Sequence, residues 1–408
     1  MFKGFTPFIL ATAATIPGVC LRIFGIHDLN PLIMTLITAV AIFCASFILT
    51  WCCEVMQIDI PQAVAVAAVA LIAVLPEYAV DIYFTWMAGK YPDSEYVHYA
   101  IANMTGANRL LIGVGWSAVI LLYMFKFRKK IRLDQEHKTE IFFLALATLY
   151  AFIIPLKGTL TLIDSAVLIG IFVWYIRLII KKPVVDEEIT GPALAVANLP
   201  KTKRIVATWG FFAIAALVIL ADAEIFSESL VASGKLLGIN EFLLVQWLAP
   251  IASEAPEFIV AITFVLRGNA GVALGSLVSS KLNQWTLLVG MIPIVYAISS
   301  GTVTHMPLGI NQLHELLLTA AQSAFAIALI CGLVVGRNAA LALLILFMAQ
   351  FMSPLYDSIF IGLFAGVEPH DASLMVFSGI YIVLSVALII IHPKKFYHLI
   401  DGIKSPKH

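Results

Sequence analysis

Two carboxylates in strongly apolar segments are the groups of this chain most able to do chemistry. A Leu-Pro-Glu run that ends at Glu77 has a counterpart, Ala-Pro-Glu, that ends 180 residues later at Glu257. An ionised carboxylate at the centre of a membrane helix costs about 3 kcal/mol even on a lenient insertion scale. A chain that keeps two such groups has a functional reason to do so, and the reversible binding of a cation is the simplest one.

Each of these glutamates has a second acid on the same helix face. Asp81 follows Glu77 by one turn, and Glu254 precedes Glu257 by three residues. Four negative charges cannot all stay ionised in a medium of low dielectric constant, so either cations neutralise them or some of them bind protons. Oxygen ligands suit hard cations, Ca²⁺ above all and Na⁺ less strongly. We therefore predict an ion-binding site built on Glu77, Asp81, Glu254 and Glu257.

Prolines beside these acids remove backbone hydrogen bonds. Pro76, Pro250 and Pro256 have no N–H to donate to the carbonyl one turn earlier. In lipid such a carbonyl must find another partner, which a coordinated ion or a water molecule can supply. Alternatively, each proline makes an ordinary helix kink, and a neighbouring helix donates a hydrogen bond to the free carbonyl. The presence of a proline beside an acid at two matching positions favours the ion site. The carbonyls concerned are those of Ile72, Gln246 and Ala252.

The composition indicates which class of protein positions these acids. With 61% hydrophobic residues, 12% charged residues and a mean hydropathy of +0.98 over 408 residues, the chain is too apolar for a water-soluble protein. Its apolar runs are long and continuous, whereas the strands of a membrane barrel are short and alternating. We predict an all-α polytopic membrane protein with about 12 transmembrane helices. The expected spans are 5–25, 31–53, 61–88, 97–125, 140–156, 160–180, 205–228, 241–266, 270–298, 311–334, 339–363 and 373–391.

A charged, proline-bearing segment divides the chain into halves with six spans each. If the first and last helices are additions, each half holds five spans, and an odd number inverts the second copy. In transporters with such repeats the substrate site lies near the midplane, where two discontinuous helices meet. The predicted parts are an extra N-terminal helix in 1–30, a first repeat in 31–180, a cytoplasmic linker in 181–204, a second inverted repeat in 205–363, and an extra C-terminal helix with a basic tail in 364–408.

The basic residues predict the orientation. If the N-terminus is cytoplasmic, 19 of the 25 Lys and Arg residues lie at cytoplasmic helix ends or loops, as the positive-inside rule requires. The densest clusters, at 126–132 and 394–395, are read as topology anchors. We expect a multi-pass protein of the cell's inner (plasma) membrane with both termini in the cytoplasm. The expected partners are the lipid bilayer and inorganic cations, no nucleic acid is implied, and the oligomeric state is open.

A second paired element follows each proline-glutamate segment. It reads Ala-Asn-Met-Thr-Gly-Ala-Asn over 102–108 and Gly-Ser-Leu-Val-Ser-Ser-Lys over 275–281. Small residues let helices approach closely, and Asn103 and Ser276 would offer oxygen ligands at equivalent places. Taken alone, such stretches are also typical of ordinary packing faces in membrane helices.

Together the four segments resemble the alpha repeats of the calcium/cation antiporter superfamily, the sodium/calcium exchangers and their divergent prokaryotic relatives. The family pattern is Gly-Thr-Ser-Leu-Pro-Glu in one helix and Gly-Asn-x-x-Gly-Ser-Asn in the next, and it occurs twice. The resemblance covers about 31–363 and implies that Glu77 and Glu257 are the central ligands, with Asn103 and Ser276 beside them. The matching positions of the second motif are Asn103, Gly106, Asn108 and Gly275, and the expected metal ligands are Glu77, Asn103, Glu254 and Glu257.

The departures from the family pattern concern the expected sodium ligands. Where the family has Thr-Ser before Leu-Pro-Glu, this chain has Ala-Val in the first half and Ser-Glu in the second. The closing Asn of the second motif becomes Lys281, a fixed positive charge near four acids. Lys281 could neutralise a carboxylate, substitute for a bound Na⁺ or mark altered coupling. We expect Lys281 and Asn108 to have a secondary, charge-balancing role.

The other polar residues within the spans are predicted to have structural roles. Arg109 is expected to snorkel or to pair with Asp81. The five cysteines lack metal-ligand spacing and are expected to be packing residues. Helix capping or interface solvation explains most of the remaining acids, which are Asp164, Asp222, Glu224, Glu315 and Asp357.

These features predict a secondary active antiporter rather than an enzyme. We expect exchange of Ca²⁺ or a similar cation for Na⁺ or H⁺ by alternating access, with no cofactor besides the transported ions. A Na⁺/H⁺ or other proton-coupled exchanger would keep the same acids and need no hydroxyl ligands. A passive cation channel would show a continuous polar pore face. A non-transporting scaffold or an intramembrane enzyme would leave the four acids unexplained.

Overall fold

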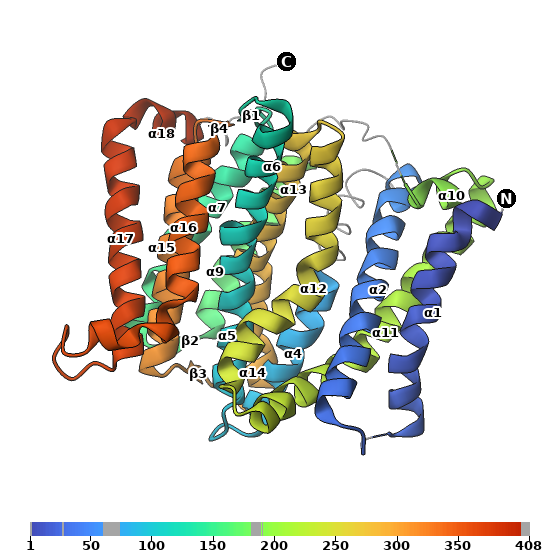
Figure 1. Cartoon of the computed structure of the whole chain (residues 1–408), viewed down its shortest axis with the longest axis horizontal. Helices are drawn as coiled ribbons and strands as arrows, with labels where there is room; N and C mark the ends of the chain where they lie inside the picture. Colours follow the sequence, from blue (N-terminus) through green and yellow to red (C-terminus); the bar gives the residue numbers. More distant parts are fainter. Residues whose placement is uncertain (1, 27, 60–73, 181–188, 190, 401–408) are drawn as a thin grey trace. The chain divides into compact units, whose positions relative to one another are not determined.

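The computed structural model in Figure 1 is almost entirely helical and describes residues 2–26, 28–59, 74–180, 189 and 191–400. In the first half the elements are α1 (Phe2–Phe24), α2 (Pro31–Asp59), α4 (Leu75–Lys90), α5 (Tyr96–Leu110), η1 (Leu111–Trp116), α6 (Ser117–Phe127), β1 (Ile131–Arg132), α7 (His137–Ala151), α8 (Ile153–Lys157), β2 (Thr159–Leu160) and α9 (Leu162–Ile179). In the second half they are α10 (Ala193–Ala197), α11 (Lys201–Leu237), α12 (Glu241–Leu266), α13 (Ala270–Asn283), η2 (Gln284–Leu288), α14 (Val289–Ser300), β3 (Met306–Pro307), α15 (Ile310–Ile330), β4 (Val334–Val335), α16 (Arg337–Phe351), η3 (Ser353–Leu355), η4 (Asp357–Phe360), α17 (Pro369–Ile391) and α18 (Pro393–Ile400).

Ten helices of the described chain are long and apolar enough to cross a membrane. Large apolar side chains such as Leu217 on α11 and Ile390 on α17 are exposed, as expected for helices that face lipid. The prediction of an all-α polytopic membrane protein is therefore confirmed.

One predicted span differs from the structure, and another is described only in part. The run 339–363 is not one helix, because α16 ends at Phe351 and the short 3-10 turns η3 and η4 follow it. The physical reason is Pro354, which has no N–H to donate to the carbonyl of Gln350. The predicted span 61–88 is described only from Val74 onward, since 60–73 lie outside the described residues.

The order of elements in the first half recurs in the second. The helices α2, α4, α5–η1–α6, α7 and α9 have counterparts in α11, α12, α13–η2–α14, α15 and α16. Four short strands, which were not predicted from the sequence, also recur in the two halves. The strand β1 pairs antiparallel with β4, and β2 pairs antiparallel with β3, so that exchanging the two halves converts one pair into the other. This order supports the proposed five-helix repeats, with α1 before them and α17 after them.

The chain forms two compact units, of which the first contains Met1–Phe84 and Ile179–Glu257. Its core lies among α1, α2, α10 and α11, and Figure 1 shows α1, α2 and α11 side by side. The packing of α2 against α11 includes buried hydroxyl groups. Thr35 donates to the hydroxyl of Ser229 at 3.0 Å and lies 3.1 Å from that of Ser233.

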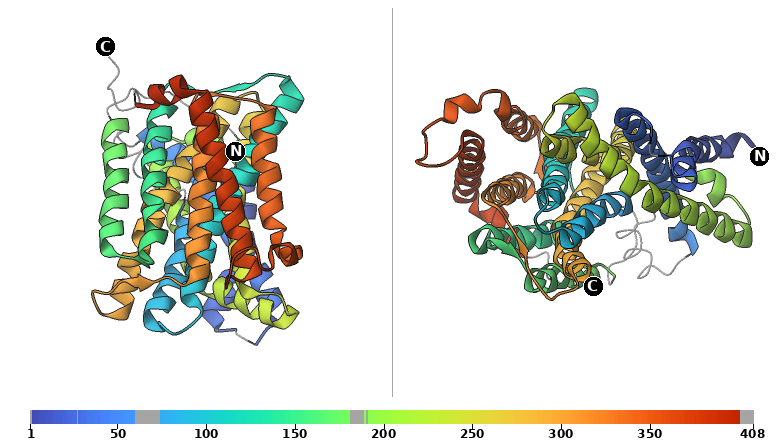
Figure 2. Two further views of the ribbon diagram at one scale, coloured as in Figure 1. Left: turned by 90° about the vertical axis from the view of Figure 1, so that its left-hand side faces the viewer. Right: turned by 90° about the horizontal axis from the view of Figure 1, so that it is seen from below.

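The second unit contains Thr85–Leu178 and Phe258–His408. Within it α15 packs against α5, α7 and α17, and Figure 2 shows α15 and α17 side by side. Its largest fully buried side chains are Trp116 and Trp285. The chain passes from one unit to the other within α4, within α12 and at the end of α9.

Candidate cation-binding site

Glu77 and Asp81 lie near the start of α4. The helix begins at Leu75, so Pro76 and Glu77 belong to its first turn, where a proline is tolerated and a carboxylate is favoured by the helix dipole. Glu77 is 2% exposed and Asp81 is fully buried. Because one turn separates them, both carboxylates project from the same side of the helix.

Glu254 and Glu257 lie in the middle of α12. Glu254 is buried and Glu257 is partly buried. The segment is one helix, α12, with Pro250 and Pro256 inside it, and its bounds agree with the predicted span 241–266. The hydroxyl of Ser253 donates to the carbonyls of Ala249 and Pro250 at 3.2 and 3.3 Å.

The described residues contain no group of three His, Cys, Asp or Glu side chains that could hold a metal ion together. The carboxylates of Glu77, Asp81, Glu254 and Glu257, all in the first unit, are therefore not arranged as a complete metal cage. Their convergence on one cation stays a prediction. Of the carbonyls expected to assist, that of Ile72 lies outside the described residues.

The two predicted oxygen ligands of the second motif differ in their surroundings. Asn103 of α5 is buried, whereas Ser276 of α13 is exposed and donates its hydroxyl hydrogen to the carbonyl of Ala273 at 3.2 Å. Both belong to the second unit. The roles of Asn103 and Ser276 as ion ligands stay predictions.

Lys281 and Asn108 form a buried polar pair in the second unit. The Nζ atom of Lys281 donates to Oδ1 of Asn108 at 2.6 Å and lies 4.4 Å from the centroid of the Trp285 ring. The amide of Asn108 also donates to the carbonyl of Met104 at 2.8 Å, which fixes its orientation. Both side chains are fully buried. Lys281, the charged residue that closes the second motif in the second half, is thus hydrogen-bonded to Asn108, the amide that closes it in the first half.

This pair joins equivalent positions of the two halves. Lys281 follows Asn108 by 173 residues, and Ser276 follows Asn103 by the same interval. Equivalent residues of two repeats touch each other only at the axis that relates the repeats, as at an isologous interface. The Lys281–Asn108 pair therefore marks that axis within the second unit.

Directly after each second motif the helix contains a π-helical turn. The turn η1 starts at Leu111 and η2 starts at Gln284, again 173 residues apart. Such turns are rare and are frequent at functional sites. Neither turn was predicted from the sequence. In η1, a Cβ on Gly113 would overlap the ring of Phe347, so this position requires glycine.

The family described as "Sodium/calcium exchanger protein" matches residues 30–181 and 207–355, which include both proposed repeats. The chain belongs to this sodium/calcium exchanger family. The resemblance read from the repeated motifs is confirmed. Comparison with curated protein sequences gave no match.

Solved structures agree with this assignment. One is the crystal structure of an "H+/Ca2+ Exchanger CAX", whose sequence is 41% identical to that of this chain. The two structures superpose with a TM-score of 0.90, and the match covers 98% of each chain. Two structures of the sodium-calcium exchanger NCX_Mj are 16% and 18% identical, with TM-scores of 0.55 and 0.53, and match 80% and 83% of this chain and 99% of that chain. At this low identity NCX_Mj supports the fold alone.

Arg109 of this exchanger does not snorkel. Its guanidinium forms an ion pair with Glu315 of α15, and both side chains are buried. The amide of Gln322 donates to the backbone carbonyl of Arg109 at 3.3 Å. The reading of Glu315 as a capping or interface residue is also wrong, because a buried guanidinium needs a buried counter-charge.

The other intramembrane acids differ in how they are satisfied. Asp164 caps α9 as predicted, since its Oδ2 accepts hydrogen bonds from the N–H and hydroxyl of Thr161 at 2.7 and 2.8 Å. Glu224 pairs with Arg22 at 2.5 Å near the surface. Asp222 departs from the prediction: it is fully buried, and neither carboxylate oxygen has a hydrogen-bond partner among the residues described.

The cysteines have the packing environment that was expected. All five thiols are free of disulfide bonds. Burial raises the pKa of the Cys331 thiol, which lies just after α15, to about 11. That thiol therefore stays protonated and unreactive at neutral pH.

Proposed function

We propose that this chain is a secondary active antiporter that exchanges Ca²⁺ for H⁺ across a membrane. Membership of the sodium/calcium exchanger family supports cation antiport, and the 41% identical structure is described as an H⁺/Ca²⁺ exchanger. Such exchange needs no covalent chemistry and no cofactor besides the transported ions. The choice of Ca²⁺ follows from the oxygen chemistry of the acids.

Lys281 is the observation that favours protons over Na⁺ as the coupling ion. Its ammonium group donates to Oδ1 of Asn108 at 2.6 Å, so the closing amide of the first motif binds a fixed cation in place of a mobile one. A fixed positive charge repels Na⁺ and offsets a nearby negative charge without an imported ion. Of the family's Thr-Ser pair, the first half keeps no hydroxyl and the second half keeps only that of Ser253, which supports the same choice.

Glu77 and Glu257 are the proposed central groups, and they bind Ca²⁺ and protons alternately. Two carboxylates neutralise one Ca²⁺, and two protons neutralise the same carboxylates. Binding of either Ca²⁺ or two protons therefore removes the negative charge that would keep the site from changing its side of access within the membrane. The empty, ionised site keeps its charge and cannot change sides, which enforces exchange. The proposed secondary ligands are Asp81, Asn103, Glu254 and Ser276.

The proposed location is the plasma (inner) membrane of the cell, with both termini in the cytoplasm. The support for this orientation is the distribution of Lys and Arg, of which 19 of 25 fall on the cytoplasmic side in that arrangement.

Purified protein in sealed vesicles tests the function directly. Uptake of Ca²⁺ is followed with an indicator dye under a pH gradient, under a Na⁺ gradient, or under neither. We expect an acidic interior to drive Ca²⁺ uptake and an equal Na⁺ gradient to drive little. Uptake driven by Na⁺ alone would replace the proposal by sodium coupling, and Ca²⁺ movement that needs no counter-ion would indicate a channel.

The variant Lys281→Asn tests the basis of the proton preference, because it places the first motif's residue at the equivalent position. We expect Na⁺ to compete with Ca²⁺ in this variant at roughly tenfold lower concentration than in the wild type, a change of about 1.4 kcal/mol in binding free energy. Lys235→Asn, at an exposed lysine near the end of α11, is the control. Equal Na⁺ sensitivity of all three proteins would remove Lys281 from the explanation.

A further inference from the structure

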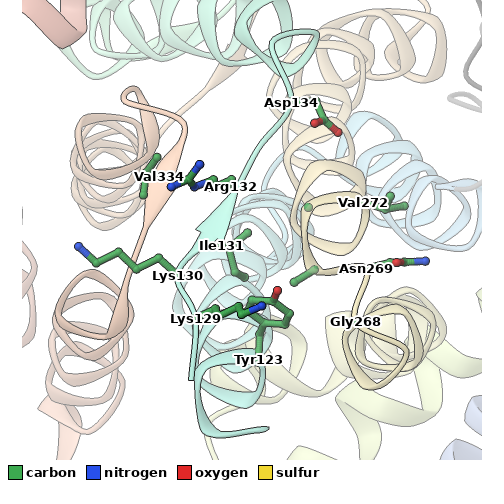
Figure 3. Close-up of a pocket in the computed structure, with 12 residues that line it drawn as sticks. Tyr123, Lys129, Lys130, Ile131, Arg132, Asp134, Gly268, Asn269, Val272 and Val334 are labelled. Atoms are coloured by element: carbon green, nitrogen blue, oxygen red, sulfur yellow. The ribbon is translucent and has the colours of Figure 1, made fainter. Parts of the chain in front are cut away.

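A basic cavity lies at the end of α6, outside the cation-binding residues. Its volume is about 630 Å³. Figure 3 shows that its lining comes from Tyr123 near the end of α6, from the 129–134 segment that contains β1, and from the first turn of α13. All of these residues belong to the second unit. The basic segment 126–132 is otherwise expected only to anchor the membrane topology.

The charges that line the cavity are mostly positive. Lys129, Lys130 and Arg132 line it together with one acid, Asp134. The three cationic side chains are exposed, and in the described part of the chain none of them has an ion pair or a hydrogen bond. Several other arginines of the chain pair with acids, as at Arg204 with Asp59. Among the described residues, the lining therefore carries more positive than negative side chains.

The start of α13 adds backbone donors to the same cavity. Ala270 and Gly271 line it, and Asn269 provides no side-chain cap to the helix. The first N–H groups of a 14-residue helix point along a dipole whose positive end favours an anion. A Cβ on Gly271 would lie 2.9 Å from the carbonyl oxygen of Arg132, so this close approach depends on glycine.

The position of the cavity indicates where an anion would come from. The helix α6 completes the membrane span Tyr96–Phe127, and the cationic segment follows at once. Phe125 is 75% exposed near this end, and the guanidinium of Arg128 lies 5.8 Å from the centroid of its ring. An exposed aromatic ring beside cations is typical of the membrane–water interface.

We infer that this cavity binds the phosphate group of an anionic ligand, with the headgroup of an anionic phospholipid as the nearest source and soluble phosphate as the other. A phosphate carries negative charge and several acceptor oxygens, which match the Lys129 ammonium, the Arg132 guanidinium and the amides of α13. The inference does not depend on which ions the protein transports.

Native mass spectrometry of the purified full-length protein tests the inference. Short-chain phosphatidylglycerol, short-chain phosphatidylcholine and inorganic phosphate are titrated separately. We expect phosphatidylglycerol to bind more tightly than phosphatidylcholine, and the double variant Lys129→Gln/Arg132→Gln to bind it about 30-fold more weakly, because each cation near an anionic lipid contributes about a factor of five. The control, Lys201→Gln/Lys203→Gln, removes two exposed charges from the start of α11 and should bind as the wild type does.

This experiment measures binding of a lipid or of phosphate, whereas the vesicle experiment measures Ca²⁺ uptake, so the failure of one proposal can be distinguished from the failure of the other. Tight binding of inorganic phosphate that is lost in the double variant would support the cavity and identify a soluble ligand. Absence of binding by phosphatidylglycerol and by phosphate, or an equal loss in the control, would overturn the inference. Lys129→Gln alone, expected to weaken binding about fivefold, gives a second test if the double variant is unstable.

Discussion

Buried charges in this exchanger are compensated in different ways. Arg109 pairs with Glu315, and Lys281 donates to Asn108, so both cations have permanent partners inside the second unit. Each of these two cations is satisfied by a fixed partner inside the protein and not by an imported ion. We propose that Glu257, together with its counterpart in the first repeat, is compensated instead by ions that come and go.

Glu257→Gln is expected to abolish Ca²⁺ exchange and to leave the protein folded. The amide keeps the size of the side chain but can neither neutralise Ca²⁺ nor carry a proton. Vesicle flux and the melting temperature in detergent measure the two properties. Glu241→Gln, in the first turn of the same helix, is the control and should retain flux. Wild-type flux in Glu257→Gln would contradict the site assigned here.

Asp222→Asn is expected to raise the melting temperature by a few degrees. A neutral amide is cheaper to bury than an ionised carboxylate that has no partner among the described residues. The matched control is Asp164→Asn, which weakens a cap of α9 and an ion pair with Lys157 and should lower the melting temperature. If Asp222→Asn also lowers it, the carboxylate has a stabilising role.

The residues of the candidate site could be selected from the sequence, but their partners could not. Repeated motifs identified the acids, Asn108 and Lys281, because a costly residue kept in lipid is conspicuous in a single sequence. The motif alignment placed Asn108 and Lys281 at equivalent positions but did not indicate their contact. Glu315 was misread because its partner, Arg109, lies on a distant helix, and local patterns do not record such pairings.

Among the elements, α13 packs very closely against α7. A Cβ on Gly275 would overlap the imidazole ring of His137 and lie 2.9 Å from its Nδ1 atom. This glycine belongs to the second motif, so a residue that sequence comparison ties to the family has a packing role here.

Gly275→Ala is therefore expected to lower the melting temperature and the yield of folded protein, because the His137 ring would have to leave its packed position against α13. The control is Gly170→Ala on α9, where an added Cβ meets no atom within 4 Å and alanine favours the helix by up to about 1 kcal/mol. Equal stability of the two variants would show that this packing is adaptable.

The ion pair between α5 and α15 should contribute far more than an exposed one. Glu315→Gln leaves the buried Arg109 charge without its counter-ion, which we expect to cost about 3–5 kcal/mol. Glu224→Gln breaks the exposed pair with Arg22, whose side chains are 42% and 47% exposed, and should cost less than about 1 kcal/mol. Thermal unfolding of the two variants in detergent compares them. Similar destabilisation would indicate that the Arg109 charge finds another partner.

Most of the helical elements could be predicted from the sequence, since long apolar runs have few alternatives in lipid. The details that failed depend on contacts between distant segments. The antiparallel pairs of β1 with β4 and β2 with β3 join loops of different halves. The π-helical turns η1 and η2, which follow the second motif of each half, were also not predicted.

At the scale of the whole molecule, both repeats are divided between the two units in the same way. The first helix of each repeat, α2 or α11, belongs to the first unit, and the later helices belong to the second. The second helix of each, α4 or α12, contributes to both units and carries the proposed central glutamate. The two proposed central glutamates therefore lie on the two helices that contribute residues to both units.

The release of protons on Ca²⁺ binding tests the central proposal most directly. Purified protein in weakly buffered detergent receives Ca²⁺, and a pH-sensitive dye records the protons that appear. The wild type should release protons as Ca²⁺ binds, and the double variant Glu77→Gln/Glu257→Gln should release none. Ca²⁺ binding without proton release, or release that persists in the double variant, would contradict the claim that these glutamates exchange the two ions.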